Sequence, residues 1–172
     1  MTDVFYEQLY KKKKSVAVFL GQISLIALAL LIAVALFVVF LFYVPMGQMI
    51  GFLAVAGIAY GSYRLNMLFD IEYEYIYLNG EIDFDKIIAK TSRSRIITVK
   101  AKNVEFYGVY DDQVKAKFQN SDIKKVLNFD SGNGNKLYYM TTKDKEYGKT
   151  LIIFEPEDRI REDFEKRIPR QW

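Results

Sequence analysis

The chain has 172 residues, which is enough for one ordinary domain and a little more. It contains no Cys and no His, so structural disulfides, thiolate nucleophiles, zinc sites and imidazole bases are excluded together. The net charge of +3 does not indicate a nucleic-acid partner, because the segment from Asp70 onward holds 19 of the 24 basic and 19 of the 21 acidic residues and is neutral. No nucleophile–base pair or phosphate loop is recognisable either, so we expect neither enzyme activity nor a cofactor or metal.

The first 14 residues are predicted to be a basic N-terminal segment, because Lys11–Lys14 stand directly ahead of a long apolar run. That run, residues 15–67, lacks Asp, Glu, Lys and Arg as far as Tyr63. It is too long for the apolar region of a cleaved signal peptide. A spanning helix needs about 20 apolar residues, so we predict two transmembrane helices, at about 16–43 and 46–63.

The distribution of basic residues predicts the orientation of these helices. Lys11–Lys14 precede the first helix and Arg64 closes the second, whereas the short external turn Val44–Gln48 has no basic residue. Basic flanks stay in the cytoplasm, so we expect a multi-pass protein of the cell membrane with both termini cytoplasmic. Neither span contains an ionisable residue, which disfavours a transporter.

Small residues recur along the second span and predict a helix–helix contact, since they allow two backbones to approach closely. The expected contact is with the first helix of the same chain. The alternative is a homodimer or docking onto another membrane protein. The small residues are Gly47, Gly51, Ala54, Gly57 and Gly61.

Residues 68–172 predict a cytoplasmic, strand-rich domain. Apolar and polar residues alternate along 71–78, where Tyr73, Tyr75 and Tyr77 are expected in the sheet core, and Asn79-Gly80 is a strong hairpin signal. Apolar residues then recur every four positions and predict one amphipathic C-terminal helix at 157–168. We therefore expect a membrane α-helical hairpin plus an α+β, mainly-β domain, built as an open barrel or sandwich capped by that helix. Other strands are expected within 81–88, 95–99, 125–130, 137–142 and 150–154, and 103–120 indicates a mixture of strand, loop and short helix.

Four stretches carry a resemblance to a known family: a Tyr/Glu-rich strand at Glu72–Tyr77, Asn-Gly-Glu-Ile-Asp at Asn79–Asp83, a basic segment at Lys86–Arg95 and a Ser-Gly turn at Asp130–Gly132. The chain resembles an uncharacterised family of small two-helix membrane proteins from low-GC Gram-positive bacteria, with a bacterial pleckstrin-homology-like cytoplasmic domain. The resemblance covers most of the chain. It implies the fold and the placement at the membrane, and it implies no activity.

Lys86, Lys90, Arg93 and Arg95 lie within ten residues and are candidate contacts to anionic lipid. Pleckstrin-homology domains hold lipid headgroups with basic residues of an early strand–loop–strand, and the resemblance puts this cluster in a comparable place. The alternative is a solvated loop with nonspecific attraction of about 1 kcal/mol per basic residue near an anionic membrane. Two acidic residues of the preceding strand, Asp83 and Asp85, are expected to be solvated charges and not a cation site.

The sequence thus predicts a non-enzymatic interaction or scaffold module, tethered to the membrane on its cytoplasmic face, with membrane lipids as partners. The alternative is an accessory subunit of a larger membrane complex that docks through the second helix.

Overall fold

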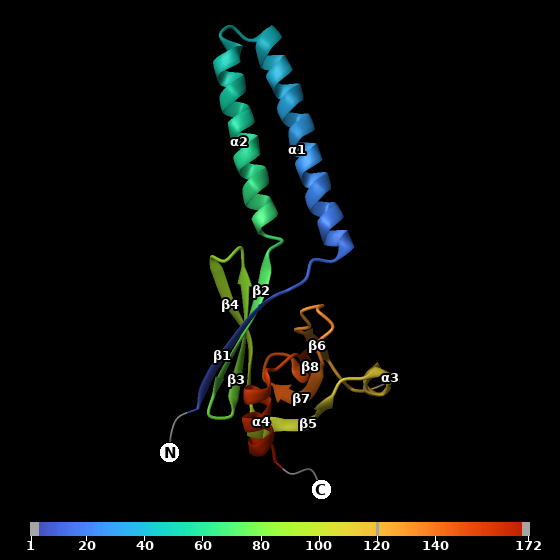
Figure 1. Cartoon of the computed structure of the whole chain (residues 1–172). Coiled ribbons are helices and arrows are strands. Elements are labelled where there is room, and N and C mark those ends of the chain that lie inside the picture. The colour runs from blue at the N-terminus through green and yellow to red at the C-terminus, as the bar shows by residue number, and fades with distance from the viewer. Residues whose placement is uncertain (1–3, 120, 170–172) are drawn as a thin grey trace. The chain divides into compact units, whose positions relative to one another are not determined.

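A computed structural model describes residues 4–119 and 121–169 of the chain (Figure 1). These residues divide into two compact units. The helical unit consists of Lys14–Ile71 together with Ile88–Lys90, and the other described residues form the sheet unit.

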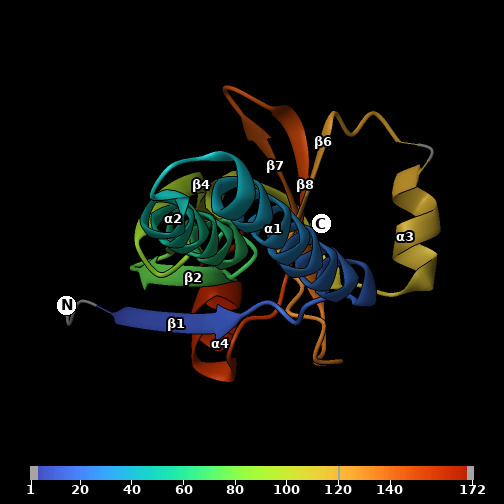
Figure 2. The same ribbon diagram turned by 90° about the horizontal axis from the view of Figure 1, so that it is seen from above.

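The helical unit is a hairpin of α1 (Val16–Tyr43) and α2 (Gly47–Met67), which lie side by side (Figures 1 and 2). The hydroxyl of Ser15 caps the start of α1 by accepting a hydrogen bond of 3.3 Å from the N–H of Val18. Pro45 cannot continue α1, and the turn closes at Met46 with a positive φ of 58°. α2 runs one turn past its predicted end at residue 63. Among the described residues, α1 alone is both long and apolar enough to meet the criteria for a membrane-crossing helix.

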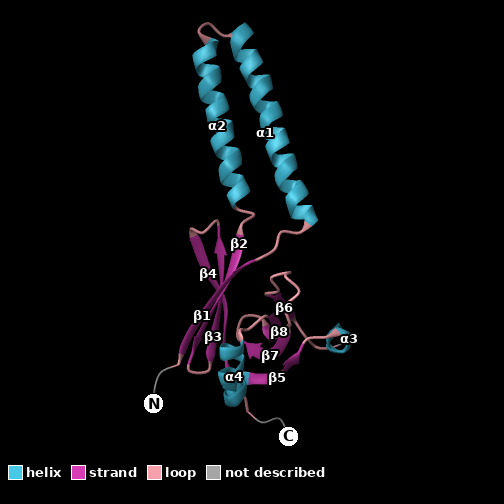
Figure 3. Ribbon diagram, viewed as in Figure 1, coloured by secondary structure: helices cyan, strands magenta, loops and turns pink. Residues whose placement is uncertain are grey.

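The sheet unit contains two four-stranded sheets, drawn in magenta in Figure 3. All strand pairs with a described register are antiparallel except β6 and β8, which run parallel. The first sheet has the order β1 (Phe5–Lys11), β2 (Ile71–Leu78), β3 (Glu81–Ile88), β4 (Ser92–Lys100). The second has the order β5 (Val104–Val109), β7 (Tyr138–Asp144), β8 (Gly148–Phe154), β6 (Lys125–Asn128).

Within the predicted basic N-terminal segment 1–14, residues Phe5–Lys11 form the strand β1. It pairs with β2 in continuous register from Phe5↔Leu78 to Lys11↔Glu72. Its side chains alternate between exposed and half-buried positions, with Tyr10 among the half-buried ones. The alternation is present in the sequence, but the partner strand comes after both helices, so no local signal links the two.

Two tight turns join the strands of the first sheet. Asn79 and Gly80 connect β2 to β3 with φ of 48° and 90°, the geometry that the sequence predicts for this pair. Ala89 and Lys90 connect β3 to β4 with φ of 54° and 56°, which is strained for residues with a Cβ. The N–H of Ala89 donates to the carbonyl oxygen of Asp70 at 2.9 Å, and this contact within the helical unit helps to hold the turn.

Aromatic rings form the core of the sheet unit. Tyr75 and Tyr77 are fully buried, so the tyrosines of β2 belong to the sheet core as predicted. Phe84 of β3 stacks on Phe129, with 4.6 Å between the ring centroids, and meets Phe154 of β8 edge-on at 5.6 Å. Residues of both sheets therefore share one core.

The C-terminal helix α4 (Asp158–Arg167) lies within one residue of its predicted bounds at each end. Ile160 and Phe164 are its buried residues. The Phe164 ring contacts Tyr77 of the first sheet at 6.3 Å and Tyr107 of the second at 6.1 Å. The sheet-rich fold with a C-terminal helix is thus confirmed, and α4 bridges the two sheets.

The ambiguous stretch 103–120 contains the end of a 3₁₀ turn at Ala101–Asn103, then β5 and the short helix α3 (Asp112–Gln119), with residue 120 outside the described residues. The Asp111 carboxylate caps α3 by accepting from the N–H of Val114 at 2.8 Å. α3 lies at the periphery of the sheet unit (Figure 2), where the Phe118 ring contacts Tyr139 of β7 at 5.3 Å.

Candidate functional site

The structure divides the predicted lipid-contact residues into two pairs. Arg93 and Arg95 lie at the start of β4 and are bound to carboxylates of β3 and β2. Lys86 lies on β3 and Lys90 in the following turn. Neither lysine forms an ion pair with any other residue that the structure describes.

Arg93 and Arg95 share the carboxylate of Asp85. The Nε of Arg93 is 2.8 Å from Oδ2 of Asp85, and the Nε of Arg95 is 3.0 Å from Oδ1. Each arginine also reaches a second acid: Nη2 of Arg93 pairs with Glu74, and Nη2 of Arg95 lies 2.8 Å from Oδ2 of Asp83. We call these five residues the arginine–carboxylate cluster.

Burial shows what this cluster does. The side chains of Glu74 and Asp85 are 5% and 4% exposed, whereas Arg93 and Arg95 are 48% and 51% exposed. The arginines therefore cover two buried carboxylates, and the hydrogen bond to Asp85 is the main cause that raises the pKa of Arg95. A buried carboxylate is stable only when it is paired, so the Nε and Nη2 groups of these arginines are committed to the carboxylates.

The expectation that Asp85 is a solvated charge is therefore wrong, since it is almost completely buried. Within the described part of the chain, no group of three or more acidic side chains is arranged to hold a metal ion. The signal for the cluster is the pattern itself: acidic residues on two adjacent strands face an Arg-x-Arg pair on the next one.

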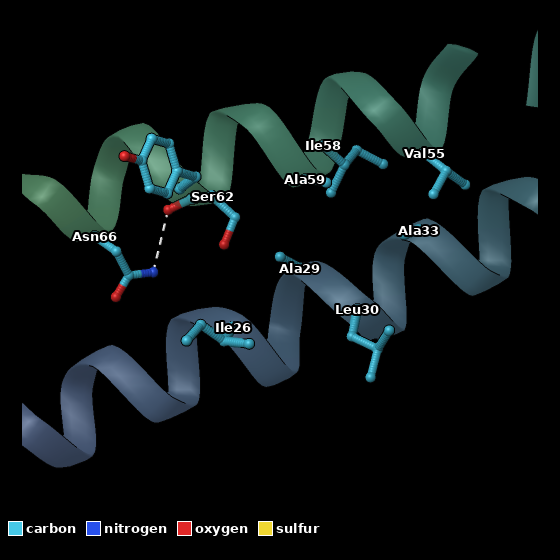
Figure 4. A pocket seen from close by; sticks show the side chains of 10 residues that line it. Ile26, Ala29, Leu30, Ala33, Val55, Ile58, Ala59, Ser62 and Asn66 are labelled. Atoms are coloured by element: carbon cyan, nitrogen blue, oxygen red, sulfur yellow. Dashed lines mark hydrogen bonds between the residues drawn. The ribbon is translucent and has the colours of Figure 1, made fainter. Parts of the chain in front are cut away.

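A second candidate site is an apolar groove of about 380 Å³ between α1 and α2. Figure 4 shows the side chains of Ala29 and Ala33 on α1 and of Ala59 on α2 directed toward the space between the helices. The groove is also lined by Ile26, Leu30, Val55, Ile58, Ser62, Tyr63 and Asn66.

Polar residues close one end of this groove. The amide of Asn66 donates to the carbonyl oxygen of Ser62 at 3.1 Å (Figure 4), and the side-chain amide of Gln22 donates to the carbonyl oxygen of Asn66 at 3.3 Å. Lys14 donates to Oε1 of Gln22 at 3.0 Å and pairs with Asp70 at 2.8 Å. These bonds connect the start of α1 to the end of α2. In the sequence, the only signal for this hydrogen-bond network is that Gln22 and Asn66 are polar residues beside apolar runs.

Two of the four glycines in the predicted contact face of α2 pack against α1. A Cβ at Gly47 would lie 1.7 Å from the carbonyl oxygen of Phe40, and one at Gly51 would lie 3.0 Å from the ring of Phe37. At Gly57 and Gly61 a Cβ would meet no described atom within 4 Å. Ala54, between the two pairs, is half-buried. The first two glycines therefore pack against α1, and the last two face away from any described contact.

Comparison with known proteins identifies the family. The family described as Bacterial PH-like domain (DUF6106) matches residues 2–172, and the chain belongs to it. No curated protein and no solved structure matched the chain. The family match confirms the pleckstrin-homology-like part of the resemblance found in the sequence, as a domain of unknown function.

Proposed function

We propose that this protein is a non-enzymatic interaction or scaffold module, held in the cell membrane by α1 and α2 with its sheet unit on the cytoplasmic face. The exposure of α1 carries the proposal. The helix has 28 residues, and 6% of its most apolar stretch is buried. In water so large an apolar surface would be unstable, whereas a bilayer covers an apolar helix on all sides.

The contact between the helices supports an intact hairpin and argues against a removable leader. Gly47 of α2 lies so close to the backbone of Phe40 that only glycine fits there, and Gly51 packs tightly against the ring of Phe37. α2 is less apolar than α1, but its last two turns carry Tyr60, Tyr63 and Arg64, aromatic and basic residues of the kind that anchor a helix at the interface. We therefore propose that both helices cross the membrane.

For contact with anionic lipid we propose Lys86 and Lys90 and no longer Arg93 and Arg95. The two arginines neutralise buried acids, so their loss would damage the fold before it weakened lipid binding. The two lysines form no described ion pair, and their attraction to an anionic surface is about 1 kcal/mol each and weakens as salt rises.

A second candidate function is that of an accessory subunit in a larger membrane complex, or of a homodimer. The observation that favours it is the open side of α2 at Gly57 and Gly61, where no described atom lies within contact of a Cβ. Small residues of this kind let a further helix approach closely in lipid. Isolation in mild detergent, followed by measurement of mass and composition, separates a solitary chain from a complex.

The membrane arrangement is tested by labelling single cysteines in this Cys-free chain. Gln48→Cys lies in the turn region between the helices and avoids the crowded position 47, and Asn133→Cys lies on an exposed loop. An impermeant thiol reagent applied to intact cells is expected to label Gln48→Cys alone, and to label Asn133→Cys after the membrane is permeabilised. Labelling of Asn133→Cys alone in intact cells would invert the orientation, and release of the chain by alkaline washing would refute the anchor.

A further inference from the structure

We propose that the groove between α1 and α2 binds one membrane phospholipid, with an acyl chain along the alanine-lined walls and the ester region at Ser62 and Asn66. The inference rests on the proposed insertion of both helices, and it adds a defined ligand to them.

The walls of the groove are the first reason. Ala29, Ala33 and Ala59 are small residues of the kind that let helices touch in lipid, yet here they border a space of about 380 Å³ (Figure 4). Ligand pockets commonly measure about 300–1,000 Å³. An unfilled space between packed helices forfeits dispersion contacts along both walls, so a fitting occupant stabilises the hairpin.

The shape of the groove favours a chain over a third helix. Its lining runs from Ile26 to Ala33 on α1, about 11 Å at the rise of an α-helix, and from Val55 to Asn66 on α2, about 17 Å. Beyond that, Gly51 meets Phe37, and the Phe37 ring contacts Phe52 at 5.2 Å. The two helices are therefore in contact toward the turn, and the groove is shorter than a spanning helix of about 20 residues, or about 30 Å.

The groove is apolar along its walls and polar at one end, which favours an amphiphilic ligand. The walls are almost wholly apolar, and the polar side chains Ser62 and Asn66 gather at the end farthest from the turn. The hydroxyl of Ser62 makes no hydrogen bond to any described residue. An ester carbonyl of a phospholipid would accept a hydrogen bond from this hydroxyl, while its chain follows the apolar walls. The polar end lies where the flanking Lys14 and Arg64 place the headgroup region of the cytoplasmic leaflet.

The test uses the full chain, delipidated in mild detergent and supplied with palmitoyl-oleoyl-phosphatidylglycerol, with native mass spectrometry as the readout. The wild type is expected to hold one phospholipid per chain. Ala29→Phe and Ala59→Phe fill the groove from opposite walls, and both are expected to lose the bound lipid. Ala35→Phe is the matched control, because Ala35 is exposed on the side of α1 away from the groove and its lipid binding is expected to be unchanged.

Ser62→Ala provides a milder variant that removes the hydroxyl and leaves the groove open. It is expected to hold less lipid than the wild type at equal helical content, as measured by circular dichroism. Equal lipid binding by the wild type, Ala29→Phe and Ala59→Phe would overturn the proposal. So would a lipid-free wild-type dimer that Ala29→Phe separates, because a second copy would then occupy the groove. Either outcome in a chain that resists alkaline extraction leaves the membrane anchor standing.

Discussion

Arg93 and Asp85 form an ion pair between an exposed and a buried side chain. Nε of Arg93 lies 2.8 Å from Oδ2 of Asp85, and the side chain of Arg93 is 48% exposed whereas that of Asp85 is 4% exposed. Nη2 of the same arginine pairs with a second buried acid, Glu74. The two arginines of the predicted basic cluster are thus the outer part of an internal charge network, whereas Lys86 and Lys90 take no part in it.

Removal of Arg93 should therefore destabilise the sheet unit. Arg93→Ala leaves Glu74 without its described ion-pair partner and Asp85 with Arg95 alone, and we expect a loss of roughly 2–4 kcal/mol in the free energy of unfolding. Thermal unfolding followed by near-ultraviolet circular dichroism measures it. Lys100→Ala is the control, because Lys100 and Glu81 are 50% and 40% exposed and such a pair contributes about 0–1 kcal/mol. Equal effects of the two substitutions would contradict a structural role for Arg93.

The sheet unit should not fold well without β1. A fragment of residues 70–172 lacks the whole of this strand, and with it two contacts of Gln8: its amide donates to the carbonyl oxygen of Glu155, and its Oε1 accepts from the N–H of Glu157, both at 2.8 Å. It also lacks the Tyr10 hydroxyl that bonds to Phe129. We expect this fragment to unfold at a lower temperature than a fusion that joins residues 4–13 to it through a flexible linker. Identical unfolding of the two proteins would show that β1 is dispensable.

Alkaline pH should loosen the sheet unit through its buried tyrosines. Burial is the main cause that raises the pKa of Tyr10 and of Tyr75, whose hydroxyls also bond to each other at 2.6 Å. In the unfolded chain these phenols ionise near pH 10. Because the unfolded state then releases protons first, the contribution of each tyrosine to stability is constant below about pH 10 and falls above it by roughly 1.4 kcal/mol per pH unit.

Chemical unfolding at a series of pH values checks this, with tyrosinate absorbance to follow ionisation. Tyr10→Phe removes one such group, so its loss of stability above about pH 10 should be shallower than that of the wild type. A wild-type stability that stays level throughout this range would contradict the burial of these hydroxyls.

The two pairs of glycines in α2 should respond differently to one added methyl group. Gly47→Ala places a Cβ against the backbone oxygen of Phe40, so the helices must separate and the hairpin should lose thermal stability in detergent. Gly61→Ala meets open space and should leave the isolated chain unchanged, or slightly more stable because alanine favours the helix. If Gly61→Ala instead releases a co-purified membrane protein, the accessory-subunit function gains direct support.

Elements set by short-range patterns were predictable from the sequence. The helix α1 follows from an uninterrupted apolar run, the β2–β3 turn from Asn79-Gly80, and α4 from a stripe that includes Ile160 and Phe164. Each depends on a few neighbouring residues, because helix periodicity and turn geometry are local properties of the chain.

Tertiary structure alone decided which charges and which strands meet. β1 lies ahead of α1, and its partner β2 follows α2. Strands so far apart in the sequence carry no local pattern that predicts their pairing. The basic pattern in the sequence does not show that Arg95 pairs with Asp83 and Asp85 of the neighbouring strand. The energy of a charge depends on its neighbours and its burial, and both are fixed only when distant segments pack together.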